Sequence, residues 1–216
     1  MKIVQPSVEL IWITPNPEHQ IELAGRTCYK SEDKITPDSA REFCRKMRKS
    51  GHHAILEHAC ASFRIITDRG ITHEIVRHRL ASYAQESTRY CNYSKDKFGN
   101  ECSFIEPPNM TLAQRNHWEA SCMECEDGYN EMLSFGASPQ IARSVLPNCL
   151  KTELVMTANL REFRHFITLR GSKAAHPQIR PIALAIWLIL MDYAPSIFED
   201  LVPIMEDMHD QTFLCD

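Results

Sequence analysis

Side chains that bind anions are concentrated in residues 73–90, HEIVRHRLASYAQESTRY. The segment contains Arg77, Arg79 and Arg89, with Ser87 close by. A guanidinium group donates two parallel hydrogen bonds and stays charged, so it suits a phosphate or a planar imide. Serine hydroxyls and backbone amides can complete the capture of a phosphate. These residue types indicate a site for a phosphorylated ligand with a planar ring.

The spacing of Arg77 and Arg79 leaves their geometry open. On an α-helix, two residues that are two positions apart lie about 200° apart around the axis. In a turn or an extended segment they point the same way. From residue types and spacing alone, a surface arginine patch with local ion pairs is the alternative to a ligand site.

Five fixed positions of this segment resemble a known signature. The order R-H-R, seven residues, Ser, one residue, Arg is similar to that of the flavin-dependent thymidylate synthases, and it stands here as Arg77-His78-Arg79, Ser87 and Arg89. Further blocks resemble this family in the same order: GRTCYKS (25–31), GHHAILEHACASFRI (51–65), IARSVLP (141–147), and TANLREFRHFITLR (157–170) with the later His176. Several blocks in order are more specific than a single motif.

The resemblance implies an enzyme, a methyltransferase that converts dUMP to dTMP by reductive methylation without a cysteine nucleophile. In that family N5,N10-methylenetetrahydrofolate gives the carbon, FADH2 gives the hydride, and NADPH reduces the flavin again. The protein contributes binding, orientation and charge placement, while the flavin carries the redox step. The resemblance also implies a homotetramer with sites shared between subunits.

The resemblance further assigns roles to individual residues. The expected flavin-binding residues are Arg77, His78, Arg79, Gln85, Asn159, Arg161 and His165. The expected nucleotide-binding residues are Glu74, Arg77, Gln85, Glu86, Ser87, Thr88, Arg89, Arg143 and Arg170. Arg170 would lie against the uracil and favour loss of its N3 proton, and His52 matches a histidine near the flavin and folate. Arg170 and His52 are therefore the expected catalytic residues, and no metal is expected.

The chain departs from the family pattern at three positions. The family often has glutamine three residues before R-H-R, where this chain has Glu74. It often has glutamate two residues before the serine, where this chain has Gln85, followed by Glu86. The glutamate thus stands one position later than in the family pattern. The resemblance therefore leaves the contacts of these three residues open.

Two other functions are alternatives to this one. A metal-dependent hydrolase could use the histidines of HHAILEH, residues 52–58. However, His53 and His58 are five residues apart, about 140° around a helix, and the H-x-x-E-H pattern is missed by one residue. A non-catalytic nucleotide or RNA binder could combine the arginines with Tyr83 and Tyr90 as stacking surfaces. The net charge of −4 weighs against that alternative.

The nine cysteines show no disulfide framework and favour a reducing compartment. The one C-x-x-C, from Cys122 to Cys125, lies in a segment with a helical pattern and has no second pair, so the structural interpretation is preferred to a metal or redox site. A thymidylate synthase with a cysteine nucleophile is a further alternative. Cys91 is the cysteine nearest the arginines in sequence, and its replacement is expected to leave activity largely intact.

Composition and pattern place the chain among soluble cytoplasmic proteins. Hydrophobic residues make up 44% of its 216 positions, enough for a substantial core. The N-terminus lacks the pattern of a secretory signal. The longest apolar stretch, residues 182–191, is about half the length that a membrane-spanning helix needs. Neither a nucleic acid nor a membrane is an expected partner.

Periodicity predicts helices and strands in irregular order. We expect strands near residues 8–14, 61–67, 103–107 and 150–157. Helices are expected after Asn16-Pro17, after Thr36-Pro37, over residues 71–80, from Thr111 to Gly136, after Ser138-Pro139, after Asn159 and from Gln178 onward. The last helix is apolar on nearly every side, so it should be covered all round, by its own chain or by another subunit. The expected fold is α+β, one domain over residues 1–216 with a small mixed or antiparallel sheet flanked by helices.

Overall fold

The computed structural model describes residues 1–95 and 99–202, which form two compact units. Unit 1 comprises Met1–Ser7, Ile65–Arg77 and Ala84–Leu154, and unit 2 comprises residues 8–64, 78–83 and 155 onward. Four strands and the turn at residues 77–78 carry the chain from one unit to the other. The expectation of a single domain stays a prediction.

The strands form two small sheets. The larger has the order β2-β3-β6-β4, built from β2 (Ser7–Ile13), β3 (Cys60–Asp68), β6 (Lys151–Asn159) and β4 (Ala81–Gln85). The smaller pairs β1 (Lys2–Val4) in parallel with β5 (Ser103–Ile105). With helices between and after these strands, the predicted α+β fold is confirmed. The four predicted strands are present, whereas the short strands β1 and β4 were not predicted.

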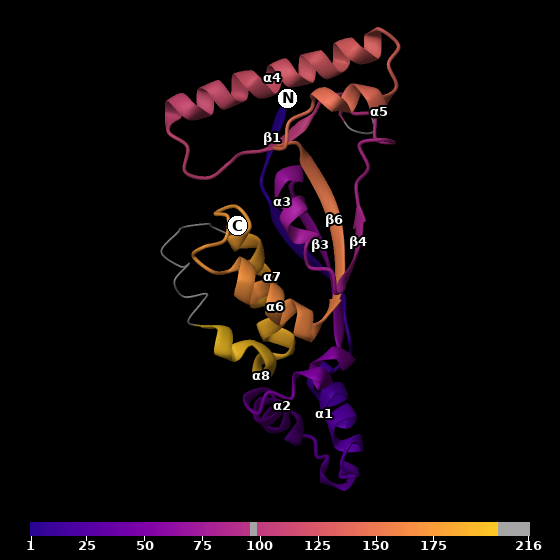
Figure 1. Cartoon of the computed structure of the whole chain (residues 1–216), viewed down its shortest axis with the longest axis vertical. Helices are drawn as coiled ribbons and strands as arrows, with labels where there is room; N and C mark the ends of the chain where they lie inside the picture. The colour runs from indigo at the N-terminus through magenta and orange to yellow at the C-terminus, as the bar shows by residue number, and fades with distance from the viewer. Residues whose placement is uncertain (96–98, 203–216) are drawn as a thin grey trace. The chain divides into compact units, whose positions relative to one another are not determined.

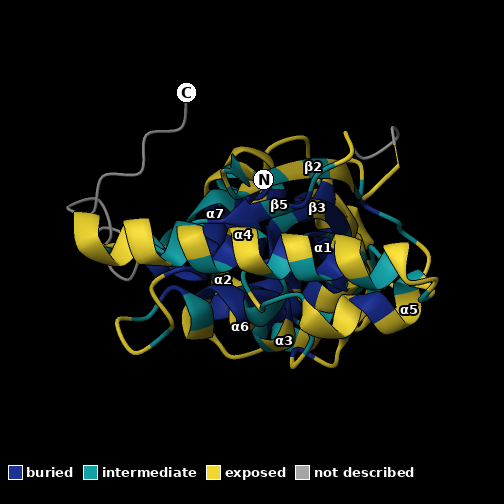
Figure 2. Cartoon of the chain, turned by 90° about the horizontal axis from the view of Figure 1, so that it is seen from above, coloured by how far each residue is buried: buried dark blue, intermediate teal, exposed yellow. Residues whose placement is uncertain are grey.

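Unit 1 packs one long helix over an apolar cluster. Helix α4 (Leu112–Ser134) begins with a reciprocal capping box between Thr111 and Gln114, and Gly136 ends it at φ 85°. Along α4 only Cys122, Glu126 and Tyr129 are buried, and Figure 2 shows the rest of the helix largely exposed. The core residues that α4 covers include Tyr93, Cys102, Phe104, Ala142 and Leu150. Unit 1 also contains α3 (Arg69–Ile75), α5 (Pro139–Ala142) and a 3-10 turn at Arg143–Val145.

Unit 2 contains the remaining helices (Figure 1). They are α1 (Pro17–Thr27), α2 (Ser39–Lys49), α6 (Leu160–Arg170), α7 (Arg180–Tyr193) and α8 (Pro195–Phe198), with 3-10 segments at Glu32–Lys34, His53–His58 and Glu199–Leu201. Helices α6 and α7 pack against each other. As predicted, α6 buries Leu160, Phe163, Phe166 and Ile167 completely. This buried stripe fixes which side chains of α6 face outward.

The last predicted helix is only partly covered by its own chain. In α7 the side chains of Ile182, Ile186 and Leu190 are buried, but Leu188 is 45% exposed and Tyr193 is 48% exposed. The described residues therefore leave part of α7 uncovered, contrary to the expectation of cover on every side. Within the described residues, no helix combines the length and the apolar character needed to cross a bilayer.

Three local predictions are wrong. The helix expected over residues 71–80 spans Arg69–Ile75, because Asp68 caps its start by accepting the Ile71 amide at 2.7 Å. Leu80, expected on the buried side of that helix, lies in a turn and is 75% exposed. Asn16 precedes α1 but makes no side-chain cap, since its backbone is left-handed at φ 47°.

Candidate functional site

The R-H-R motif lies in the turn between α3 and β4. The side chains of Arg77 and Arg79 are exposed, whereas His78 between them is 3% exposed. Arg77 and Arg79 therefore lie in a turn and not on a helix, and in a turn alternate side chains can point the same way. Two guanidinium groups are available to a ligand, and the intervening imidazole belongs to the interior of unit 2.

Both ring nitrogens of His78 have partners in unit 2. Its Nδ1 lies 3.1 Å from Oε1 of Glu162, and its Nε2 accepts from Nε of Arg170 at 3.1 Å. The ring also packs edge-on against Phe166, with centroids 4.9 Å apart. Burial, followed by the nearby Arg170 and His165, lowers the pKa of His78 to about 4. His78 is therefore a neutral imidazole at physiological pH.

The first turn of α6 presents the other expected flavin-binding residues. Asn159 caps the helix by accepting the Glu162 amide at 2.9 Å, as the sequence pattern predicted. The exposed Arg161 donates to Glu57 at 2.6 Å, and His165 is exposed one turn further along. Arg170 ends α6 and is half-buried. Arg161 and His165 can therefore reach a ligand from the outer side of α6.

The two altered positions at the end of β4, Gln85 as its last residue and Glu86 just after it, have partners inside unit 1. The amide nitrogen of Gln85 donates to the hydroxyls of Thr72 (3.0 Å) and Thr152 (3.2 Å). The carboxylate of Glu86 accepts from Lys151 at 2.9 Å and from the Tyr93 hydroxyl at 2.9 Å. Lys151 thus balances the charge of the displaced acid within the same unit.

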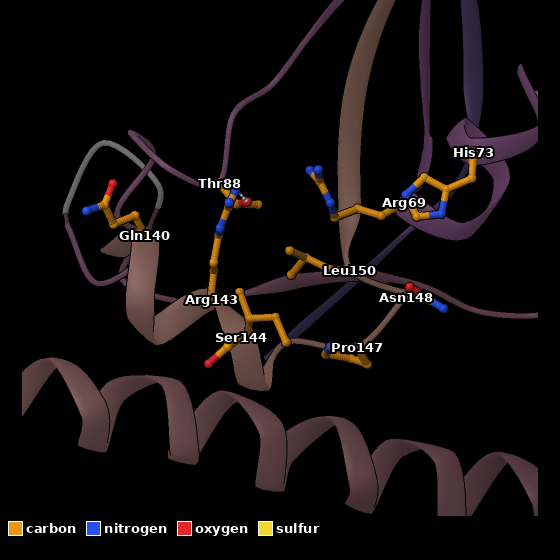
Figure 3. Close-up of a pocket in the computed structure, with 10 residues that line it drawn as sticks. Arg69, His73, Thr88, Gln140, Arg143, Ser144, Pro147, Asn148 and Leu150 are labelled. Atoms are coloured by element: carbon orange, nitrogen blue, oxygen red, sulfur yellow. Dashed lines mark hydrogen bonds between the residues drawn. The ribbon is translucent and has the colours of Figure 1, made fainter. Parts of the chain in front are cut away.

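A pocket of about 470 Å³ opens in unit 1 beside the S-x-R part of the motif (Figure 3). Nη1 of Arg143 donates to the Thr88 hydroxyl at 3.0 Å, although 55 residues separate them. Figure 3 shows the Arg143 side chain extending from its helical turn towards Thr88, with the Arg69 guanidinium on the facing wall. Two guanidinium groups and a hydroxyl in one hollow form a suitable site for an oxyanion.

The neighbouring motif residue Arg89 contacts the lining of this pocket. Nε of the exposed Arg89 donates to Gln140, a pocket residue, at 3.0 Å. The Ser87 hydroxyl accepts the Arg89 amide at 3.3 Å. In the part of the chain that the structure describes, neither a histidine nor a carboxylate is hydrogen-bonded to Ser87, so nothing activates it as a nucleophile.

Sequence reasoning missed several residues of the pocket. They are Arg69, His73, Gln140, Ser144 and Asn148, together with the apolar Leu146, Pro147 and Leu150. Arg69 and Asn148 are brought together by a backbone bond from the Gly70 amide to the Asn148 carbonyl, at 3.1 Å. The one local signal is the D-R-G sequence at residues 68–70, which is typical of a turn but here begins helix α3.

The histidines of residues 52–58 do not assemble a metal site. Within the described residues, the one grouping of at least three possible metal ligands is His78, Glu162 and His165, with ligand atoms within 4.8 Å of one another. There the Arg170 guanidinium already occupies Nε2 of His78, and its positive charge disfavours a bound cation. His52 is exposed and remains open to a ligand.

The C-x-x-C cysteines do not pair with each other in the structure. The Cys122 sulfur lies 3.5 Å from that of Cys149, in the core beneath α4. Burial raises the pKa of both thiols, so neither is a ready thiolate. Cys91 is half-buried in unit 1. These observations favour the structural interpretation of the cysteines.

Comparison with known proteins gives consistent matches over most of the chain. Residues 9–196 match the sequence profile of the family described as thymidylate synthase complementing protein. The chain is 33% identical over 205 residues to a flavin-dependent thymidylate synthase of Geobacter sulfurreducens, covering 91% of this chain and 87% of that one. It is 37% identical over 194 residues to one of Mycobacteroides abscessus, covering 83% and 78%.

A solved structure shares the fold. The crystal structure of the UMP/dUMP methylase PolB from Streptomyces cacaoi, bound with 5-Br dUMP, superposes with a TM-score of 0.80. The match covers 94% of this chain and 97% of that one, at 22% sequence identity.

Proposed function

Because the chain belongs to the flavin-dependent thymidylate synthase family, we propose that it converts dUMP to dTMP by reductive methylation. The proposed carbon donor is N5,N10-methylenetetrahydrofolate, the flavin is FAD, and NADPH is the reductant. The metal-dependent hydrolase is not supported, since residues 52–58 form no ligand grouping. The acidic net charge still weighs against an RNA binder.

The observation that carries this proposal is the pocket of unit 1, where Arg143 and Thr88 meet at 3.0 Å. Both were expected to bind the nucleotide, and the fold brings them together from distant parts of the sequence. Their donors suit the dUMP phosphate, because charge-assisted hydrogen bonds to phosphate are strong. Ser87 and Arg89 add a hydroxyl and a second exposed guanidinium at the same loop. Gln85 and Glu86 shape this region through their internal contacts, and Glu74 is proposed to bind the nucleotide from the neighbouring α3.

The residues present also fit a flavin dinucleotide. FAD needs cations for its diphosphate and polar donors for its ring system, and the exposed side chains of Arg77, Arg79 and Arg161 provide such cations. His165 offers an exposed imidazole on the same helix as Arg161. Asn159 keeps its amide nitrogen as a donor while its oxygen caps α6. Gln85 and His78 contribute by holding the neighbouring backbone through their buried contacts.

Arg170 is the residue proposed to act on the uracil. C5 of uracil is a poor nucleophile, and a cation near the ring favours loss of the N3 proton and so makes C5 more nucleophilic. A guanidinium also hydrogen-bonds two acceptors of a planar imide at once. When bound, the reduced flavin supplies the hydride that completes the methyl group. The exposed His52 is proposed to lie near the flavin and folate.

We further propose a homotetramer in the cytoplasm, with sites that combine residues of different subunits. The exposed apolar side chains of α7, Leu188 and Tyr193, are available to a second copy of the chain. Apolar side chains at such exposure are commonly covered in obligate assemblies.

A binding experiment tests the proposal. Purified full-length protein is incubated with FAD, desalted and scanned for flavin absorbance, and dUMP is then titrated into it in a calorimeter. The proposal predicts retained flavin and dUMP binding that the Arg143→Ala variant weakens by about tenfold or more. A colourless protein that ignores dUMP would contradict it. Titration with deoxyuridine, which lacks the phosphate, separates phosphate capture from base recognition.

A further inference from the structure

The His78 ring packs against one row of side chains on α6. Glu162, Phe166 and Arg170 follow one another at four-residue intervals, so their side chains share one side of the helix. The His78 ring contacts all three, through Nδ1, a T-shaped ring contact and Nε2 respectively. The Tyr83 hydroxyl donates to the His78 carbonyl at 2.8 Å and fixes the backbone of the same residue. Three contacts to the ring and one to the backbone therefore hold His78 within unit 2.

The hydrogen bond from Arg170 determines the tautomer of His78. A guanidinium nitrogen can only donate, so Nε2 of His78 must present its lone pair to Nε of Arg170. In a neutral imidazole the single proton then resides on Nδ1. That N–H points at Oε1 of Glu162, 3.1 Å away, which must accept it. The three groups form one directional chain from Arg170 through His78 to Glu162.

Glu162 makes an unusual use of its position in the helix. It is the third residue of α6, where a glutamate commonly bonds back to the backbone of the capping residue. Asn159 does cap the Glu162 amide, but the Glu162 carboxylate turns to His78 instead. The residue is 5% exposed, and burial raises its pKa. A carboxyl group buried at such a cost needs a compensating partner, and His78 is that partner.

We propose that Glu162 is a positioning residue, which acts through the His78 tautomer to hold the Arg170 guanidinium in its working orientation. This inference rests on the proposed function, in which Arg170 acts on the uracil. With the carboxylate in place, His78 presents the lone pair of Nε2 to Nε of Arg170, and this bond fixes the orientation of Nε in the guanidinium plane. Without an acceptor at Nδ1, the ring can move its proton to Nε2. Arg170 then loses the His78 acceptor of its Nε, and its orientation is less well fixed.

Nuclear magnetic resonance tests the first half of the proposal on flavin-free, full-length protein. The nitrogen shifts of ¹⁵N-labelled histidine report the tautomer, and the His78→Gln variant identifies the His78 signals. The wild type is expected to show the proton on Nδ1, with slow solvent exchange of the Arg170 Nε–H proton. Glu162→Ala should lose both features, while Glu162→Gln, whose amide oxygen still accepts, should retain them. A wild-type His78 protonated at Nε2 would overturn the proposal without any variant.

Steady-state kinetics of the FAD-loaded enzyme test the second half. Glu162→Ala should lower kcat by about tenfold to a hundredfold, as loss of other outer hydrogen-bond partners does, with KM for dUMP changed by less than about threefold. Glu162→Gln should restore most of the turnover. Glu42→Ala removes an exposed carboxylate of α2 and should change nothing. Normal turnover in Glu162→Ala would overturn the positioning role.

The magnetic resonance and kinetic experiments together distinguish a failure of this proposal from a failure of the proposed function. If the wild type makes no dTMP but shows the expected tautomer, the proposed function fails while the hydrogen-bonded chain stands. If the wild type is active and the tautomer differs, the positioning proposal alone fails. If Glu162→Ala does not fold, the His78 tautomer in the wild type and in Glu162→Gln still tests the positioning proposal. Both of these proteins keep a polar side chain at position 162.

Discussion

Arg170 and His78 are joined by a hydrogen bond of 3.1 Å, from the guanidinium Nε to the imidazole Nε2, although 92 residues separate them in sequence. The bond links the end of α6 to the R-H-R turn. It uses Nε, the guanidinium nitrogen that lies nearest the backbone of the helix. A residue proposed to act on the substrate is thus anchored by a residue of the signature motif.

Arg170→Ala is expected to lower kcat by about a hundredfold or more, because a preorganised cation beside a developing negative charge is worth about 3 to 4 kcal/mol. Turnover of dUMP under saturating conditions measures the loss. Folding should survive, since Arg170 is half-buried at a helix end, and circular dichroism during heating checks this. Arg41→Ala, which removes an exposed guanidinium from α2, is the matched control. Near-normal turnover would remove Arg170 from the mechanism.

Ser87→Ala should raise KM for dUMP by about tenfold while kcat changes by no more than about threefold, because a lost hydrogen bond to a charged group costs about 1.5 to 3 kcal/mol of binding. Among the described residues the hydroxyl has no activating partner, so a binding role is expected. Initial rates over a range of dUMP concentrations separate the two parameters. A dead enzyme that still binds dUMP would instead indicate a nucleophilic serine.

Arg69→Ala should weaken dUMP binding by about tenfold, although sequence reasoning did not select this residue. Its guanidinium lines the unit 1 pocket and contacts the Glu86 carbonyl at 3.4 Å. Calorimetric titration of dUMP measures the effect. Arg115→Ala removes a guanidinium from the exposed side of α4 in the same unit and should leave binding unchanged. Equal affinities in the wild type and Arg69→Ala would exclude Arg69 from the phosphate site.

The buried imidazole of His78 should make stability depend on pH. In the folded chain its pKa is lowered to about 4, from an ordinary value of 6.5. Between these values the unfolded chain binds a proton that the folded chain excludes. The free energy of unfolding therefore falls as the pH falls from about 6.5 towards 4. His165, Glu162, Tyr83 and Arg170 are the titratable or charged groups around the ring.

Urea unfolding of the flavin-free protein at pH 7 and pH 5 measures this dependence. The wild type should lose about 1 to 2 kcal/mol more than His78→Gln between the two pH values. The variant keeps the neighbouring groups, so the difference isolates the imidazole. The same loss in both proteins would show that His78 titrates normally in the folded chain.

Local signals predicted much of the fold. The start of α4 at Thr111, the Gly136 stop and the Asn159 cap all appear as the sequence indicated, and the Thr111–Gln114 capping box was not predicted. The end of α3 could not be predicted, since apolar spacing continued to Leu80 while the chain turned at Arg77. That turn depends on tertiary contacts, among them the Tyr83 hydroxyl on the His78 carbonyl.

The candidate site was predictable only where a motif named its residues. Arg143 and Thr88 were expected to bind the nucleotide, and the fold brings them to one pocket. Arg69 belongs to no recognised motif. Its place in the pocket results from the backbone hydrogen bond between Gly70 and Asn148. Likewise, Glu162 was interpreted only as a capping residue, and its bond to His78 spans 84 positions of sequence.

The most direct test of the account is the conversion of dUMP to dTMP by the purified protein with methylenetetrahydrofolate, FAD and NADPH, followed by chromatography of the nucleotides. The account predicts dTMP that requires both FAD and NADPH, that persists in a Cys91→Ser variant, and that falls by about a hundredfold in Arg170→Ala. Folded wild-type protein that binds flavin yet forms no dTMP under these conditions would contradict it.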